Sequence, residues 1–270
     1  MREHGDEHAP RRRRATEEDA MSDEQSTTLR FPHTEIFTVE GEHFTADEVL
    51  EALGETLSSE RRQAIDQVVE GRTFEVTVVC EDLYDLGNVA AVMRSAEALG
   101  FASMHVIKRQ ERFKTSARIT TGVDKWLDLR TWDDTARCVE ELKARGYRVV
   151  ATHLGERARP LDEFDFTQPT AVVFGNEHAG VTDELIELAD ATCVIPMAGF
   201  AQSLNISVAA ALLCYHVVKD RERRQGHHGD LNDEEKRILR ASYYLRGHKT
   251  GEKYMLGWRA RNPAAATSSP

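Results

Sequence analysis

The sequence predicts an α/β protein with a mainly parallel sheet and helices on both of its faces. Two observations carry this prediction. Short apolar runs rich in valine and isoleucine alternate with helical segments between about residues 74 and 224. Most of the helical segments end at a glycine or begin at a capping residue, so their boundaries are marked. Such alternation is typical of strands joined by crossover helices.

Five apolar runs supply the expected strands. In chain order they are FEVTVVCED from residue 74, SMHVIK from 103, YRVVATHL from 147, PTAVVFG from 169 and ATCVIPM from 191. The expected helices between and after them are NVAAVMRSAEALG from residue 88, DDTARCVEELKARG from 133, TDELIELAD from 182 and SLNISVAAALLCYHVVKDRERR from 203. Thr182 is the expected cap of the third helix.

Composition shifts along the chain divide it into four parts. Residues 1–32 are charged and poor in large apolar residues, so we expect a disordered arm. Residues 33–73 read as an N-terminal helical extension, residues 74–224 as the α/β domain, and residues 225–270 as a basic helix and tail. The arm contains a second methionine, Met21, that also fits a start.

Several function classes lack their motifs in this sequence. There is no glycine-rich dinucleotide loop, no phosphate-binding P-loop and no G-x-S-x-G nucleophile elbow. No run approaches the roughly 20 apolar residues of a membrane helix, and the N-terminus does not resemble a signal peptide. The four cysteines are widely spaced, so we expect buried, reduced thiols and a cytoplasmic protein.

Polar residues follow the predicted strands at three places. Asn88 and Arg94 lie six apart in the first helix, Gly175 and Glu177 follow the fourth strand, and the stretch that includes Asn205 follows the fifth. Ligands of parallel sheets bind at the carboxyl ends of strands. Taken singly, each feature also fits a surface arginine, a turn, or Ser203 as a helix cap.

The same three places carry a family resemblance. The segments NVAAVMRSAEALG, VFGNEHAG and IPMAGFAQSLNISVAAA resemble, in order, the three motifs of the SPOUT superfamily, within it the TrmH family of RNA ribose 2′-O-methyltransferases. The QSLN form from Gln202 is most similar to the subgroup that methylates guanosine 18 in the D-loop of tRNA. The similarity runs from about residue 59 to residue 224.

The resemblance implies a deep trefoil knot, S-adenosyl-L-methionine as methyl donor, tRNA as partner, and a homodimer in which each site is completed by the partner. It requires neither a metal nor a membrane. The cofactor contacts that it implies are Thr152, His153, Leu154, Gly175, Ile195, Met197, Ser203 and Leu204. The catalytic residues that it implies are Arg94, Asn88, Glu177 and Asn205.

Arg94 matches the family arginine that activates the ribose hydroxyl. A free guanidinium keeps its proton above pH 12, so it is a poor base unless its surroundings change it. Stabilisation of developing negative charge is the other role open to it. Before Asn88 the family often has Pro-His, and this chain has Leu86 and Gly87, which loosens a loop near the ribose.

The net charge of −11 conceals local basic segments. The stretch 219–261 carries twelve positive and seven negative residues, and so is +5. The basic residues expected to bind RNA are Arg61, Arg62, Arg72, Lys108, Arg109, Arg112, Lys114 and Arg118. Four tail aromatics can either stack on bases or pack the tail helix onto the body: Tyr243, Tyr244, Tyr254 and Trp258.

Two alternatives to a tRNA enzyme stay open. One is a 23S ribosomal RNA guanosine 2′-O-methyltransferase, although ribosomal relatives often carry a compact N-terminal RNA-binding domain, and residues 33–72 look too short and too helical for one. The other is a catalytically silent RNA-binding member of the fold. The presence of Asn88, Arg94 and Glu177 disfavours it.

Overall fold

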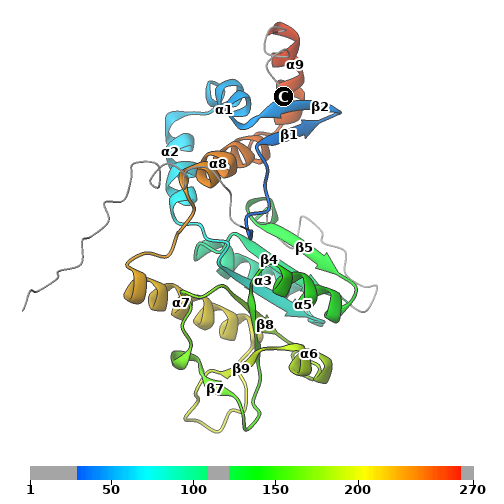
Figure 1. Cartoon of the computed structure of the whole chain (residues 1–270), viewed down its shortest axis with the longest axis vertical. Coiled ribbons are helices and arrows are strands. Elements are labelled where there is room, and N and C mark those ends of the chain that lie inside the picture. The colour runs from blue at the N-terminus through cyan, green and yellow to red at the C-terminus, as the bar shows by residue number, and fades with distance from the viewer. Residues whose placement is uncertain (1–28, 109–121, 263–270) are drawn as a thin grey trace, which may run out of the picture.

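The computed structural model describes residues 29–108 and 122–262, and it confirms the expected α/β fold (Figure 1). The main sheet has seven strands in the order β5-β4-β3-β8-β6-β9-β7, and every pair of neighbours runs parallel. The strands are β3 (Val76–Glu81), β4 (Ser103–Ile107), β5 (Asp128–Trp132), β6 (Arg148–Thr152), β7 (Arg159–Pro160), β8 (Thr170–Phe174) and β9 (Ala191–Val194).

Helices cover both faces of this sheet. On one face lie α3 (Leu86–Ala98) and α7 (Ile206–Gln225), which pack against each other. On the other face lie α5 (Thr135–Ala144) and α6 (Asp183–Leu188). No helix in the described part of the chain is long and apolar enough to cross a membrane.

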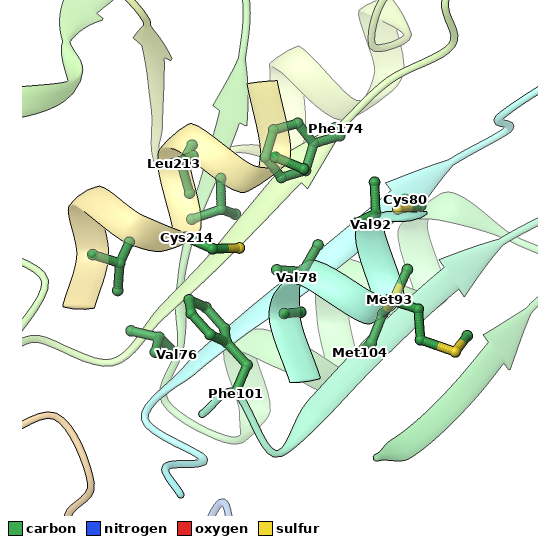
Figure 2. Packing of buried hydrophobic residues seen from close by; sticks show 14 of the residues in the cluster. Val76, Val78, Cys80, Val92, Met93, Phe101, Met104, Phe174, Leu213 and Cys214 are labelled. Atoms are coloured by element: carbon green, nitrogen blue, oxygen red, sulfur yellow. The ribbon is translucent and has the colours of Figure 1, made fainter. Parts of the chain in front are cut away.

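The alternation of side chains along β3 explains why the sheet needs both layers. Val76, Val78 and Cys80 point into the core shared with α3 and α7 (Figure 2). Val79 points to the opposite face and joins the core under α5 and α6. Successive side chains of a strand face opposite sides, and a strand buried on both faces therefore reads as a continuous apolar run.

The order of strands reverses between β3 and β8. From β3 the chain moves outward through β4 to β5, and then returns to build β6, β8 and β9 on the other side. Such a reversal opens a crevice at the carboxyl ends of the strands, where open α/β sheets bind ligands. The polar segments predicted from the sequence follow these strand ends.

The N-terminal extension is not purely helical, which corrects the expectation for residues 33–73. The helices α1 (Ala46–Gly54) and α2 (Ser59–Glu70) follow a hairpin of β1 (Ile36–Val39) and β2 (Glu42–Thr45). The turn places Glu40 at φ 48° and Gly41 at φ 89°. A two-residue hairpin turn with a positive φ at both central positions matches the right-handed twist of the two strands that it joins.

The tail forms two helices, α8 (Asp233–Gly247) and α9 (Gly251–Arg261), where one was expected. Both pack against α1 in a second core, so these helices form one unit with the described residues that precede β3, the terminal body (Figure 1). Tyr243 and Tyr244 are buried there, and the hydroxyl of Tyr243 donates to the carbonyl of Trp126 at 2.8 Å. These two tyrosines pack the tail and are not free to stack on bases.

Two buried arginines hold the connection between α7 and the terminal body. Arg221 donates to the carbonyl of Phe166 at 2.8 Å and to the carbonyl of His228, and it pairs with Asp230. Arg72 donates to the carbonyls of Glu97 at 2.7 Å and Phe101 at 3.0 Å.

The burial of Arg72 corrects its prediction as an RNA-binding residue. Its side chain is 1 % exposed, and its guanidinium forms a salt bridge with Glu97. A phosphate outside the protein therefore does not reach it.

All four cysteines are free and buried, as expected from their spacing. Burial raises the pKa of Cys138, Cys193 and Cys214 to about 12 in each case. Their thiols therefore stay protonated at neutral pH and lack the thiolate that acts as a nucleophile.

The substitution Arg221→Met tests the structural role of the pair formed by Arg221 and Asp230. It leaves Asp230 without its cation, and breaking a buried pair costs about 3 kcal/mol of unfolding free energy. Urea unfolding measures this loss. The matched change Lys219→Met, two residues away in an exposed pair with Glu222, is expected to cost under about 1 kcal/mol. Equal losses of unfolding free energy in the two variants would contradict a structural role for the pair of Arg221 and Asp230.

Candidate active site

A cavity of about 670 Å³ opens at the carboxyl ends of β6, β8 and β9. All eight residues predicted as cofactor contacts line it, together with Glu177 and Asn205. The eight are Thr152, His153, Leu154, Gly175, Ile195, Met197, Ser203 and Leu204. The structure therefore gathers residues from three separate segments around one space of the size that small ligands occupy.

Backbone hydrogen bonds fix the floor of the cavity. The hydroxyl of Thr152 donates to the carbonyl of Val173 at 3.0 Å, and the amide of His153 donates to the carbonyl of Cys193 at 2.9 Å. These bonds continue the pairing of β6 with its neighbours beyond the regular strand. The end of β6 at the cavity is therefore held to both of its neighbouring strands.

Gly175 shows why the loop after β8 requires glycine. A Cβ atom at this position would lie 2.1 Å from the backbone of Gly180 and Val181. Paired hydrogen bonds of 2.8 Å in both directions between Asn176 and Gly180 close the loop. The Asn176 amide also donates to the carbonyl of Asp82 at 2.8 Å, which ties the loop to the end of β3.

Glu177 connects this loop to the start of α3. Its carboxylate accepts hydrogen bonds from the Asn88 amide at 2.8 Å and from the backbone amides of Tyr84 at 2.9 Å and Asp85 at 3.4 Å. Burial alone would raise the pKa of Glu177. The hydrogen bonds from Asn88 and the backbone outweigh it and lower the pKa below its ordinary value. Glu177 is therefore an ionised anchor at neutral pH.

The entrance to α7 corrects the interpretation of Ser203 as a helix cap. The cap is Asn205, whose side-chain oxygen accepts from the Ser207 amide at 2.9 Å. Ser203 lies in the segment before the helix and lines the cavity. Its hydroxyl is thus not used to cap the helix.

The structure brings Asn88 and Glu177 together but leaves Arg94 apart from them. Arg94 is exposed on α3, and it is not among the residues that line the cavity. Six residues span about 9 Å along a helix axis, so Arg94 lies almost two turns beyond Asn88.

The basic residues predicted to bind RNA are distributed differently. Arg61 and Arg62 are exposed on α2, and Arg62 donates to the carbonyl of Gly54 at 2.9 Å. Lys108 follows β4 and is half-buried, and burial lowers its pKa. Arg109, Arg112, Lys114 and Arg118 lie outside the described residues.

Two residues near the site were not predicted. Glu81 is a buried carboxylate that accepts hydrogen bonds from Thr135 and Thr182, and it anchors α5 and α6 to the end of β3. Tyr84 is 76 % exposed beside His178, at 6.4 Å between ring centroids. Glu81 could have been found as an acidic residue at the end of an apolar strand, and Tyr84 as an aromatic residue in a polar loop.

The cavity fits the shape and chemistry of S-adenosylmethionine. The lining includes the apolar residues Ile195, Met197 and Leu204 and the polar residues His153, Glu177 and Ser203. This donor set suits a ligand that is part aromatic and part zwitterionic.

Replacing Glu177 with glutamine tests the anchor. A group whose pKa is lowered by folding stabilises the fold above its unfolded pKa, here about 4.5, and loses that contribution as the pH falls through the folded pKa. We expect Glu177→Gln to cost about 1–2 kcal/mol of unfolding free energy at pH 7, and less below pH 4. Glu187→Gln, an exposed control on α6, should show neither effect. A penalty for Glu177→Gln that does not change with pH would contradict the anchor.

Comparison with known proteins agrees with this geometry. Residues 75–215 match the SpoU rRNA Methylase family. The chain is 33 % identical over 201 residues to the tRNA (guanosine(18)-2'-O)-methyltransferase of Borreliella burgdorferi, covering 73 % of this chain and 92 % of the relative. It is 38 % identical over 161 residues to the enzyme of that name from Thermus thermophilus, covering 60 % and 83 %.

Solved structures give the same result. The A. aeolicus TrmH/SpoU tRNA modifying enzyme superposes with a TM-score of 0.62 at 32 % identity, covering 70 % of this chain and 98 % of that chain. AviRb from Streptomyces viridochromogenes, in complex with AdoMet, superposes with a TM-score of 0.50 at 30 % identity, covering 57 % and 62 %. The chain belongs to the SpoU rRNA methylase family and is an S-adenosylmethionine-dependent methyltransferase.

Proposed function

We propose that this enzyme methylates the ribose 2′-hydroxyl of guanosine 18 in the D-loop of tRNA. One observation carries the proposal: Glu177 lines the cavity and also accepts a hydrogen bond from Asn88 at 2.8 Å. This contact joins the cavity that suits the methyl donor to α3, the helix that carries Asn88 and Arg94.

The methyl donor fits the cavity at the ends of β6, β8 and β9. When bound, S-adenosylmethionine supplies an electrophilic methyl group, so no metal is needed to activate it. The backbone around Thr152–Leu154 and Gly175 would hold the ligand, and Ser203 would contact it through its hydroxyl. Asn205 keeps the segment before α7 in place by capping that helix.

Arg94 is proposed to act at the ribose. The hydroxyl must lose its proton as its oxygen is methylated, and a guanidinium stabilises the negative charge that develops there. Guanidinium groups are poor bases, so we assign Arg94 electrostatic stabilisation rather than general-base action. Asn88 and Glu177 would orient the ribose and the start of α3.

A homodimer explains why Arg94 lies outside the cavity of its own protomer. Val208, Leu212 and Tyr215 are each about half exposed along one side of α7, at a spacing that forms a continuous apolar stripe. Phe200, in the loop before α7, is fully exposed. Exposed apolar patches of this kind mark protein interfaces. We propose that pairing along α7 brings the partner subunit's Arg94 to the cavity.

Relatives favour tRNA over ribosomal RNA as substrate. Those at 33–38 % identity bear the name tRNA (guanosine(18)-2'-O)-methyltransferase. The 23S rRNA (guanosine-2'-O-)-methyltransferase RlmB of Acinetobacter baylyi is 29 % identical over 160 residues, covering 58 % of this chain and 64 % of that protein. A silent RNA-binding role is disfavoured because Asn88, Arg94 and Glu177 are all present.

Three further features belong to this proposal. The catalytic domain spans residues 74–224, with 1–32 as an arm, 33–73 as the N-terminal extension and 225–270 as the tail. The segment from Gly175 into α7 forms a deep trefoil knot. A tRNA substrate places the enzyme in the cytoplasm.

The function is tested by incubating the purified protein with labelled S-adenosylmethionine and either total tRNA or ribosomal RNA. Mapping of the labelled nucleoside should give 2′-O-methylguanosine at position 18 of tRNA. Label in ribosomal RNA alone, or on a base instead of a ribose, would overturn the proposal.

Arg94→Ala is expected to reduce methyl transfer by at least about a hundredfold, because charge stabilisation at a reacting oxygen is worth that much. Binding of S-adenosylmethionine, measured by calorimetry, should be unchanged. Arg137→Ala on α5 is the control, because Arg137 is exposed far from the cavity. Near-normal turnover of Arg94→Ala would contradict its role.

Leu212→Glu is expected to convert the dimer into a monomer, because it places a charge in the apolar stripe. Sedimentation velocity measures the mass, and methyl transfer should fall with it. Val68→Glu changes an equally exposed apolar residue on α2 and should leave the dimer intact. A monomeric wild-type protein, or a dimer that survives Leu212→Glu, would count against the interface.

A further inference from the structure

Four cations of α8 and α9 are neutralised by carboxylates. The pairs are Lys236 with Glu70, Arg237 with Glu35, Asp47 and Glu234, Arg240 with Asp66, and Arg259 with Glu48. The tail that carries a charge of +5 in the sequence therefore exposes much less free positive charge than its composition indicates. A polyanion would therefore meet paired cations at Lys236, Arg237, Arg240 and Arg259.

At one place two cations without a carboxylate partner among the described residues share a single aromatic ring. The guanidinium of Arg61 lies 5.2 Å from the centroid of the Trp126 ring, and the ammonium of Lys125 lies 4.9 Å from it. Neither cation forms an ion pair with a carboxylate in residues 29–108 and 122–262. The indole is half-buried and is itself held by an edge contact with Tyr243.

The end of α8 closes around the same indole. A Cβ atom on Gly247 would lie 3.1 Å from the Trp126 ring and 3.6 Å from the Arg61 guanidinium. Arg246 and Lys249, which flank this glycine, are exposed and likewise form no ion pair with a carboxylate of the described residues. Two cations, Arg61 and Lys125, thus lie against one aromatic ring, and Arg246 and Lys249 belong to the end of α8 and the turn that lie beside it.

The chemical nature of a cation's partner decides how much of its positive charge remains available to a ligand. A carboxylate restrains a cation and cancels its charge, whereas an aromatic ring restrains it and leaves the charge in place. Close by, burial lowers the pKa of His33 to about 4, helped by Arg246 and Arg130 and opposed by Asp128. This cluster therefore presents oriented and uncancelled positive charge.

We propose that Arg61, Lys125, Trp126, Arg246 and Lys249 form a docking surface, the indole platform, for the phosphate backbone of the substrate RNA. The inference rests on the proposed function, and it names where the RNA is held outside the cavity. Phosphate oxygens accept well from Arg and Lys, and such contacts position RNA without reading its bases.

The position of the platform indicates how much RNA the enzyme engages. Trp126 lies directly before β5, at the amino end of that parallel strand, whereas the cavity opens at the carboxyl ends of its neighbours. The terminal body and β9 accordingly lie toward opposite ends of the molecule (Figure 1). An RNA that meets both must extend across the sheet, so a short stem-loop should not use the platform.

The salt dependence of RNA binding tests the platform. Affinity for a full-length tRNA transcript is measured at several salt concentrations, without methyl donor, for wild type, Arg61→Ala and Lys125→Ala. Each variant should bind ~tenfold more weakly at 0.1 M salt and lower the log–log slope by about one. Asp124→Asn, which removes a neighbouring negative charge, should strengthen binding.

Lys236→Ala is the matched control, because it changes the net charge by the same amount but removes a cation already paired with Glu70 at 2.6 Å. It should leave the salt slope unchanged. Trp126→Phe should retain affinity and Trp126→Leu should lose it about two- to fivefold, because only the former keeps an aromatic face. A D-arm stem-loop should bind all the variants equally.

Equal salt dependence of RNA affinity for Lys125→Ala, Lys236→Ala and wild type would overturn the proposal of the indole platform. Unchanged binding of S-adenosylmethionine shows that each variant is folded. RNA binding is measured apart from methylation, so the two proposals fail separately. A protein that binds RNA through the platform but methylates nothing would refute only the proposed function.

Discussion

The carboxylate of Glu177 is the contact on which the candidate site depends. It accepts from Asn88 and from two backbone amides at the start of α3, while its own loop is closed by Asn176 and Gly180. Helix α3 and the cavity wall belong to segments about 90 residues apart in the chain. Without this anion, several donors at the start of α3 would lose their partner. One ionised group therefore fixes the distance between the donor cavity and the acceptor helix.

A second constraint joins the two ends of the chain to the sheet. Arg221 and Arg72 are buried where α7 turns toward α8, and each donates to carbonyls of the α/β domain. These bonds set how the terminal body lies on the sheet. They also separate two uses of arginine in this protein. Buried guanidinium groups hold the architecture, while those beside Trp126 keep a charge that RNA can use.

Much of the fold was predictable because apolar runs and glycine boundaries are local signals. All five expected strands form, and the residues predicted around the cofactor gather at one cavity. The hairpin before α1 was missed because its strands have four residues each and its turn has no typical Asn-Gly pair. Strand β5 was missed because it is polar at a sheet edge. Partners distant in sequence decided the rest: Arg72 is buried, and carboxylates of α1 and α2 pair with Lys236, Arg237, Arg240 and Arg259 of the tail.

The link between Asn88 and Glu177 is tested most directly by a double-mutant cycle. The rate of 2′-O-methylguanosine formation in tRNA is measured for wild type, Asn88→Ala, Glu177→Ala and the double variant. If the two residues act as one unit, the double variant is about as slow as the slower single variant, with a coupling of about 1–3 kcal/mol. If the two losses multiply, the residues act independently, and the account of a site organised by this carboxylate is wrong.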